Sequence, residues 1–235
     1  MFINTTYRST DDEIMDNFSM EGEMLREALD KIATINKRLG GNNVTIKGLK
    51  ELLRDEQKEK TISIIDIGCG NGDMLRAIAD YGRKNNLNFK LTGVDANEFT
   101  VNYARKLSAN YPEICYEELD VMTDKFSAMQ GDIILATLVL HHFKNEEIEG
   151  LLKTVVKKAN KGVIINDLHR SRAAYYLFKT ICLFIKNPMV VKDGLISVLR
   201  GFKKRELIAF TNKLQLTGCT IRWKWAFRYQ WIIRK

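Results

Sequence analysis

The chain has 235 residues, of which 45% are hydrophobic and 28% are charged, enough for one substantial core but short for two full domains. Its cysteines (Cys69, Cys115, Cys182 and Cys219) are widely spaced, so we expect neither a metal site nor a disulfide framework. The sequence has no signal-peptide pattern and no apolar run of the roughly 18 to 20 residues that a membrane span requires. We therefore expect a cytoplasmic protein.

The net charge of +8 is unevenly distributed along the chain. Residues 1–143 carry 17 lysines and arginines against 23 acidic residues, whereas residues 144–235 carry 20 against 6. A basic half can attract nucleic acid, an anionic membrane surface or an acidic small molecule, or it can simply aid solubility. Charge alone does not choose among these partners.

The first predicted elements are helices. Apolar residues recur at helical spacing from Met20 to about Leu39, the pair Gly40-Gly41 predicts a stop, and a second short helix is expected from Ile46 to about Leu53. We expect residues 1–58 to form an N-terminal helical lid over the domain formed by residues 59–235.

A different periodicity follows the two helices. Short, nearly continuous apolar runs are typical of strands buried on both faces of a parallel sheet, and they occur at Thr61–Ile67, Lys90–Val94, Asp132–Thr137 and Gly162–Asn166. A further strand is expected to end at Leu119-Asp120-Val121. Helical stretches separate these runs, near Gly72–Lys84, Glu98–Asn110 and Asn145–Lys158. Strands that alternate with helices predict an α/β fold with a doubly wound, mostly parallel sheet.

The C-terminal residues alternate between apolar and basic. From Ile221 to Ile233 every second residue is apolar, which predicts antiparallel strands with a turn near Ala226-Phe227 and places Trp223, Trp225 and Trp231 in the core. With these two C-terminal strands, the predicted sheet has seven strands. A long connection, about 168–204, precedes a helix near Arg205–Leu216, and we expect this insertion after the fifth strand to carry function.

One loop carries the strongest chemical signal. Asp66-Ile67-Gly68-Cys69-Gly70-Asn71-Gly72 follows a predicted strand and precedes a helix, where glycines let the backbone approach a ligand. A dinucleotide-binding loop would have glycine at position 73, but this position is Asp73, and two carboxylates repel a diphosphate. A ligand that is cationic and free of phosphate, such as S-adenosylmethionine, fits this loop better. Asp95 and Asp120, at the ends of the next two strands, are placed to accept from ribose hydroxyls and an adenine amino group.

The run DIGCGNGD, followed by GVDAN, ELDV and LATLVLHHF, resembles the successive motifs of class I S-adenosylmethionine-dependent methyltransferases over roughly residues 60–167. The resemblance implies a Rossmann-like methyltransferase fold and S-adenosylmethionine as cofactor. It also implies a set of cofactor-binding residues. Asp66, Gly68 and Gly70 hold the methionine end with Cys69 beside them, Asp95 and Ala96 lie at the ribose, Asp120 and Val121 at the adenine, and Thr137 beside the methionine.

The stretches ALDKIATINKRLGG, INDLHRS and KDGLISVLRGF are similar to bacterial small-molecule methyltransferases, some of which act beside polyketide-synthesis enzymes. This similarity implies a small apolar, phenolic or enolic acceptor, lipidic or polyketide-derived, with O-methylation favoured over C-methylation. The segment 168–204 would then be a substrate cap, in which Arg170, Tyr175 and Tyr176 are the candidate pocket residues. A basic, aromatic helix in this segment could instead contact a membrane surface.

The candidate proton acceptor is His169, directly after the fifth parallel strand, because a histidine at that edge meets both cofactor and acceptor. His142 is a second candidate, although LHHF could simply close the fourth strand. Arg8 could bind the cofactor's carboxylate or remain a solvated surface residue.

Two other functions stay open. The chain could be a non-catalytic S-adenosylmethionine-binding or synthase-associated module, or it could methylate nucleic acid. The second is disfavoured because no Asn/Asp-Pro-Pro-aromatic tetrad follows the fourth strand to hold a flipped base. The sequence does not determine the oligomeric state.

Overall fold

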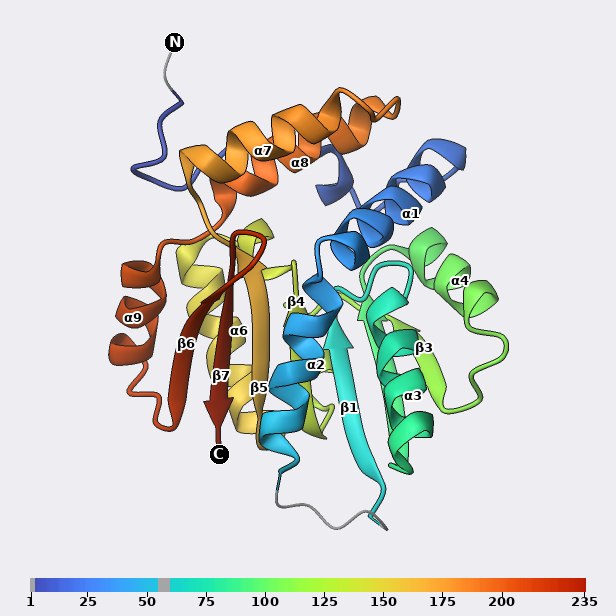
Figure 1. Cartoon of the computed structure of the whole chain (residues 1–235). Coiled ribbons are helices and arrows are strands. Elements are labelled where there is room, and N and C mark those ends of the chain that lie inside the picture. Colours follow the sequence, from blue (N-terminus) through green and yellow to red (C-terminus); the bar gives the residue numbers. More distant parts are fainter. Residues whose placement is uncertain (1–2, 55–59) are drawn as a thin grey trace.

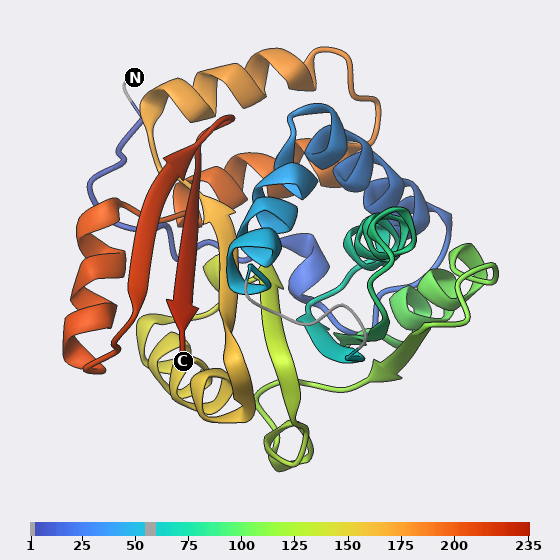
Figure 2. The same cartoon turned by 60° about the horizontal axis from the view of Figure 1, so that its bottom comes forward.

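The computed structural model describes residues 3–54 and 60–235. Its centre is a seven-stranded sheet in the order β3-β2-β1-β4-β5-β7-β6, in which β7 is antiparallel to both of its neighbours (Figures 1 and 2). The strands are β1 Ile62–Ile67, β2 Phe89–Asp95, β3 Ile114–Glu118, β4 Gly131–Thr137, β5 Ala159–Leu168, β6 Cys219–Lys224 and β7 Arg228–Arg234. The predicted doubly wound, mostly parallel sheet of seven strands is confirmed.

Helices cover both faces of the sheet, which explains the continuous apolar runs in the central strands. Ile64 and Ile133 lie in a core cluster with α2, α3 and α4, while their neighbours Ile65 and Ile134 lie in a second cluster with α5, α6 and α9. The helices that cover these faces are α2 Gly41–Leu52, α3 Asp73–Asn85, α4 Glu98–Leu107, α5 Asp124–Ser127, α6 Asn145–Lys158 and α9 Lys204–Lys213. A short 3₁₀ helix, η2 Leu140–His142, follows β4.

The remaining helices form a roof over the carboxyl ends of the parallel strands (Figure 1). They are η1 Ile14–Asp16, α1 Glu23–Arg38, α7 Arg172–Cys182 and α8 Pro188–Arg200. Leu25 and Leu29 of α1 pack against Met189 and Val190 of α8, so segments far apart in the sequence share one small apolar cluster. We call η1, α1, α7 and α8 the roof.

The second helix begins earlier than the sequence predicted. Gly40 has the left-handed φ of +77° and ends α1, but α2 starts at once with Gly41 instead of Ile46. Leu49 and Leu52 of α2 belong to the core cluster under β1 and β5, so α2 covers the sheet and the roof takes only the part of the chain before it. The predicted boundary between residues 58 and 59 lies outside the described residues.

Two further predictions need correction. Trp231 is buried, but Trp223 and Trp225 are 47% and 61% exposed, because β6 is an edge strand and Trp225 lies in the turn beyond it. The third strand ends at Glu118, so Asp120 lies in the loop that follows it. Among residues 3–54 and 60–235, no helix is long and apolar enough to cross a bilayer.

Candidate active site

A cavity of about 1290 Å³ lies between the carboxyl edge of the sheet and the roof. The loops after β1, β2, β3 and β4 line it from below, and residues of η1, α1, α7 and α8 line it from above. All nine residues that the sequence assigned to cofactor binding line this one cavity: Asp66, Gly68, Cys69, Gly70, Asp95, Ala96, Asp120, Val121 and Thr137. The fold therefore brings together the strand ends that the sequence could only place one at a time.

The glycine loop after β1 needs its glycines for conformation and space. Gly68 and Gly70 have left-handed φ angles of +62° and +53°, and a Cβ on Gly68 would come within 2.4 Å of the Val139 side chain. The Gly70 N–H donates to Asp95 Oδ2 at 3.0 Å, which ties the loop to the end of β2. A Cβ on Gly70 would meet only Leu29 Cδ2, at 3.9 Å, so a ligand can approach the backbone closely at this glycine.

Uncompensated acidic groups surround this loop. Asp66 is 2% exposed, and its Oδ1 has no hydrogen-bond partner among the described residues. Burial raises the pKa of Asp66 well above its ordinary value, and repulsion from Asp73 and Asp95 adds to the effect. A cation placed here would relieve this repulsion, whereas a diphosphate would increase it. The donor set therefore fits the sulfonium and ammonium groups of S-adenosylmethionine.

The other strand ends keep acceptors available. Asp95 accepts from the N–H groups of Gly70 and Asn97, and an ionised carboxylate has capacity for further donors. Asp120 accepts from the Met122 N–H at 2.8 Å. Thr137 Oγ1 lies 3.2 Å from Thr45 Oγ1 of α2, so the end of β4 is held against that helix.

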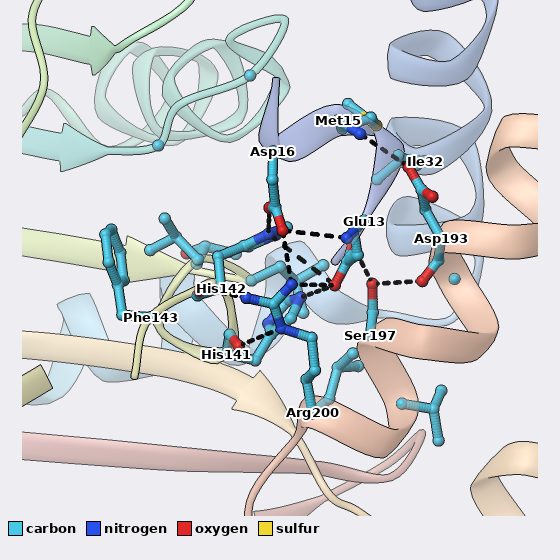
Figure 3. A pocket seen from close by; sticks show the side chains of 18 of the residues that line it. Glu13, Met15, Asp16, Ile32, His141, His142, Phe143, Asp193, Ser197 and Arg200 are labelled. Carbon is cyan, nitrogen blue, oxygen red and sulfur yellow. Dashed lines mark hydrogen bonds and ion pairs between the residues drawn. The ribbon is translucent and has the colours of Figure 1, made fainter. Parts of the chain in front are cut away.

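A second polar cluster lies in the wall of the cavity and joins η1, η2 and α8 (Figure 3). His141 Nδ1 lies 2.7 Å from Asp167 Oδ1, and His142 Nδ1 lies 2.6 Å from Asp16 Oδ1. Arg200 of α8 donates to Asp16 Oδ2 at 2.6 Å. These contacts give two imidazole–carboxylate pairs side by side, with ring centroids 4.3 Å apart.

The His141–Asp167 pair has the form of a catalytic base and its orienting carboxylate. Burial alone would raise the pKa of Asp167, but attraction and a hydrogen bond from His141 outweigh it and hold the pKa below the ordinary value. An ionised carboxylate can only accept, so Nδ1 of His141 carries the proton and Nε2 of a neutral ring is left as an acceptor. The sequence does not reveal this pair, because His141 and Asp167 meet only where β4 and β5 lie side by side.

Glu13 faces both histidines. It is 6% exposed, Ser197 Oγ donates to its Oε2 at 2.7 Å, and its Oε1 has no hydrogen-bond partner among the described residues. This oxygen lies 3.9 Å from His141 Nε2, from His142 Nδ1 and from Arg200 Nη1. Burial raises the pKa of Glu13 to about 7.

Glu13, His141 and His142 place one potential metal-ligand atom each within 4.8 Å of one another, a cluster that the sequence analysis did not foresee. Both Nδ1 atoms already contact carboxylates, and the guanidinium of Arg200 beside Glu13 Oε1 repels a second cation. We therefore interpret the cluster as acid–base groups.

His169 lines the cavity, but its hydrogen bond argues against its predicted role as the base. The Trp223 indole N–H can only donate, and it donates to His169 Nδ1 at 3.2 Å. Burial and the nearby Lys203 and Arg170 lower the pKa of His169, which favours the neutral ring. A neutral ring with Nδ1 as acceptor carries its proton on Nε2 and has no free nitrogen for another proton.

The prediction that Arg170, Tyr175 and Tyr176 line the substrate pocket is wrong, because none of the three lines the cavity. Arg170 is fully buried and pairs with Glu206, while Tyr176 is 45% exposed. The face of α7 that lines the cavity instead carries Ala174, Leu177, Phe178 and Ile181. The spacing predicted the helix, but only the tertiary structure fixes its rotation about its axis.

Arg8 is neither a solvated surface residue nor free for a ligand. Its guanidinium donates to the carbonyls of His141, Phe143 and Arg200 and to Asn145 Oδ1. It thereby ties the N-terminal segment to the loop after β4. Burial lowers the pKa of Arg8 from its ordinary value, although nearby acids partly oppose this.

Glu13 predicts a pH dependence of stability. Its pKa is about 7 in the folded protein against 4.5 ordinarily, so stabilisation that is present below pH 4.5 is lost as the pH rises towards 7. We expect the free energy of unfolding of the wild type, relative to Glu13→Gln, to fall by about 3 kcal/mol between about pH 4.5 and 7.5. Urea denaturation of both proteins across this range measures the difference, and parallel curves would contradict the burial of an uncompensated Glu13.

Comparison with known proteins agrees with this geometry. Residues 64–162 match the family model described as a methyltransferase domain. Over 112 residues the chain is 30% identical to the non-reducing polyketide synthase mapC of Penicillium brevicompactum, a match that spans 45% of the chain but only 4% of that synthase.

Solved methyltransferases have the same fold. The plantazolicin methyltransferase BpumL, crystallised with a pentazolic analogue and SAH, superposes with a TM-score of 0.66 at 18% identity over 89% of this chain and 90% of its own. The DszA carbon methyltransferase superposes with a TM-score of 0.67 at 13% identity over 88% of this chain and 57% of its own. The family match identifies residues 64–162 as a methyltransferase domain, and the solved structures show that the chain shares their fold.

Proposed function

We propose that the protein transfers the methyl group of S-adenosylmethionine to a small apolar acceptor with an ionisable phenolic or enolic group. One observation carries the proposal: a single cavity contains both the acidic glycine loop and the His141–Asp167 pair. The loop provides a site for a cationic methyl donor, and the pair provides a base for the acceptor. A module that only binds the cofactor would have no need of the base.

The cofactor assignment follows the strand ends. We assign Asp66, Gly68, Cys69 and Gly70 to the methionine end, with Thr137 beside it, because the orphaned carboxylate and open backbone lie there. Asp95 and Ala96 are assigned to the ribose, and Asp120 and Val121 to the adenine. When bound, S-adenosylmethionine supplies the methyl group from its sulfonium.

Catalysis by the protein's own residues then consists of positioning and proton removal. Asp167 holds the His141 ring in the tautomer whose Nε2 can accept a proton, as an orienting carboxylate does in a catalytic triad. His141 Nε2 would accept the acceptor's proton as the oxygen or carbon nucleophile forms. The His142–Asp16 pair and Glu13 border the same space and limit how the acceptor's polar end is oriented.

The acceptor's class is inferred from the roof and from the relatives. We assign the roof helices η1 and α1 as a lid and residues 168–204 as a substrate cap, because Leu177, Phe178 and Ile181 of the latter give the cavity an apolar wall. The matched polyketide synthase supports a polyketide-derived acceptor, and the apolar wall suits a polyketide-derived or lipidic acceptor alike. We keep O-methylation as the expected outcome, and a methylated carbon in the product would identify the alternative.

Asp95→Asn tests the cofactor site. Loss of the charged acceptor should weaken binding of S-adenosylhomocysteine about tenfold or more, since a hydrogen bond to a charged group contributes about 1.5–3 kcal/mol. Calorimetry measures the affinity. Glu98→Gln, at an exposed position at the start of α4, serves as the matched control. Equal affinities in all three proteins would refute the assignment of Asp95.

His141→Ala and Asp167→Asn test the base. Both should lower kcat by about 10²-fold or more while the affinity for S-adenosylhomocysteine stays within about threefold. His169→Ala should lose far less turnover. Activity is followed with a labelled methyl donor and a panel of alkyl phenols and pyrones. If His169→Ala lost turnover and His141→Ala kept it, the original assignment of His169 would be restored.

The outer side of the substrate cap favours an anionic membrane surface as a partner. Leu183 and Phe184, in the turn after α7, are 79% and 85% exposed. No acidic residue occurs from 168 to 192, and Lys179, Lys186 and Lys192 are exposed around the turn. Exposed apolar tips next to basic side chains suit the interface of an anionic bilayer. Because α7 also lines the cavity, an acceptor could pass from such a surface to the site.

We expect the purified protein to sediment with vesicles of phosphatidylcholine and phosphatidylserine and much less with phosphatidylcholine alone. The double variant Leu183→Asp/Phe184→Asp should abolish this binding, whereas Ile208→Asp, at a 41% exposed position on α9, should not. Equal binding of both variants, or no binding of the wild type, would contradict a membrane partner.

A further inference from the structure

Arg228 is a buried cation that has no counterion among residues 3–54 and 60–235. It begins β7, opposite Leu168 of β5, at the carboxyl edge of the parallel strands, and it lines the cavity. The side chain is 3% exposed, and neither Nε nor Nη1 has a hydrogen-bond partner among the described residues. Burial lowers the pKa of Arg228 to about 10, so the guanidinium is still charged at neutral pH.

The other buried arginines at this edge are fully engaged. Arg170 pairs with Glu206 and donates to the carbonyls of Thr5, Thr6 and Gly201. Arg200 pairs with Asp16 and donates to the carbonyls of Asp11, His141 and His142. The fold therefore supplies partners to its structural arginines, and Arg228 is the exception among the described residues.

The two acids whose charges act on Arg228, Asp167 and Asp73, already have other hydrogen-bond partners. Asp167 and Asp73 each raise its pKa through space, but no ion pair between them and Arg228 occurs among the described residues. Asp167 is held by His141, and Asp73 accepts from Asn42 Nδ2 at 2.9 Å. A buried, unpaired charge is strongly unfavourable unless a group of opposite charge binds to it.

The surroundings of Arg228 indicate where a partner would sit. A Cβ on Gly41 would lie 3.0 Å from Arg228 Cζ, so the guanidinium packs against the glycine that begins α2. The same helix reaches Thr137 at the end of β4 through Thr45. The guanidinium thus lies on the side of the cavity where the methionine end of the cofactor is assigned. The acids around the glycine loop suit the cationic groups of that end, but they do not suit its carboxylate.

We propose that Arg228 binds a carboxylate inside the cavity, by a fork of parallel N–H···O bonds. Two sources share this chemistry: the α-carboxylate of S-adenosylmethionine and a carboxylate on the acceptor. The proposal rests on the proposed function only in that the cavity admits the cofactor. The carboxylate bound by Arg228 differs from the groups assigned to Asp66 and Asp95, which are cationic groups and ribose hydroxyls.

The test compares S-adenosylhomocysteine with its decarboxylated analogue, S-adenosyl-3-thiopropylamine, by calorimetry. If the cofactor is the source, the wild type prefers S-adenosylhomocysteine about tenfold or more, and Arg228→Met loses this preference while its affinity for the analogue is unchanged. Arg228→Lys should recover part of the preference. Arg222→Met, on the exposed neighbouring strand and paired with Glu51, is the matched control and should behave as the wild type.

If the preference survives in Arg228→Met, the acceptor is the remaining source. Protein saturated with S-adenosylhomocysteine should then bind salicylate in preference to phenol, and Arg228→Met should lose that preference. If the wild type bound no S-adenosylhomocysteine, the proposed function would be refuted. If Arg228→Met kept both the preference for S-adenosylhomocysteine and the preference for salicylate, only the role of Arg228 would be refuted.

Thermal denaturation separates a ligand-binding arginine from a structural one. Removing an unpaired buried charge should leave the melting temperature of the ligand-free protein unchanged or raised in Arg228→Met. S-adenosylhomocysteine should then raise the melting temperature less in the variant than in the wild type. A large drop in the melting temperature of the ligand-free variant would show that Arg228 supports the fold and would overturn the proposal.

Discussion

Charged groups are buried at the carboxyl edge of the parallel strands, and their burial determines what each part of the site can do. A parallel sheet exposes its strand ends at one edge, and here Asp66, Asp95 and Asp167 lie at or near those ends. The roof lies over this edge, where Asp66 and Asp167 are buried. In a low-dielectric space a charged group either pairs with an opposite charge of the protein, changes its protonation state, or gains a partner only when a ligand binds. These three outcomes divide the edge into structural, catalytic and binding parts.

The structural part consists of charges that have partners within the protein. Arg8 and Arg200 connect the N-terminal segment and α8 to the carbonyl groups of the loop after β4, and Arg170 anchors the start of the segment 168–204 through Glu206. Such buried ion pairs gain little net stability, but they fix the relative positions of the elements that they join. The histidine-bearing loop after β4 is therefore held from two sides, which suits residues that must align an acceptor.

The hydrogen-bond partners of Nδ1 distinguish His141 from His169. His141 is bound through Nδ1 to an ionised carboxylate, which leaves Nε2 as an acceptor, while His169 receives an indole N–H on Nδ1 and is left with a donor. The residue type is the same, but opposite hydrogen-bond partners give opposite proton chemistry. Glu13, with a raised pKa and an unpartnered oxygen, is an ionisable neighbour of His141 whose protonation responds to pH near neutrality.

The sequence by itself determined the strand–helix alternation, the cofactor loop and the acidic residues near the next strand ends, because hydrophobic period and glycine spacing are local properties. It did not find His141, Glu13 or Arg228, since their roles arise where β4 meets β5, where η1 folds over the cavity, and where β7 returns antiparallel to β5. It also misjudged the exposure of Trp223 and the face of α7 that carries Tyr176. Helical or strand period identifies an element, but only packing against distant parts of the chain decides which side is buried, which charge is paired and which is left for a ligand.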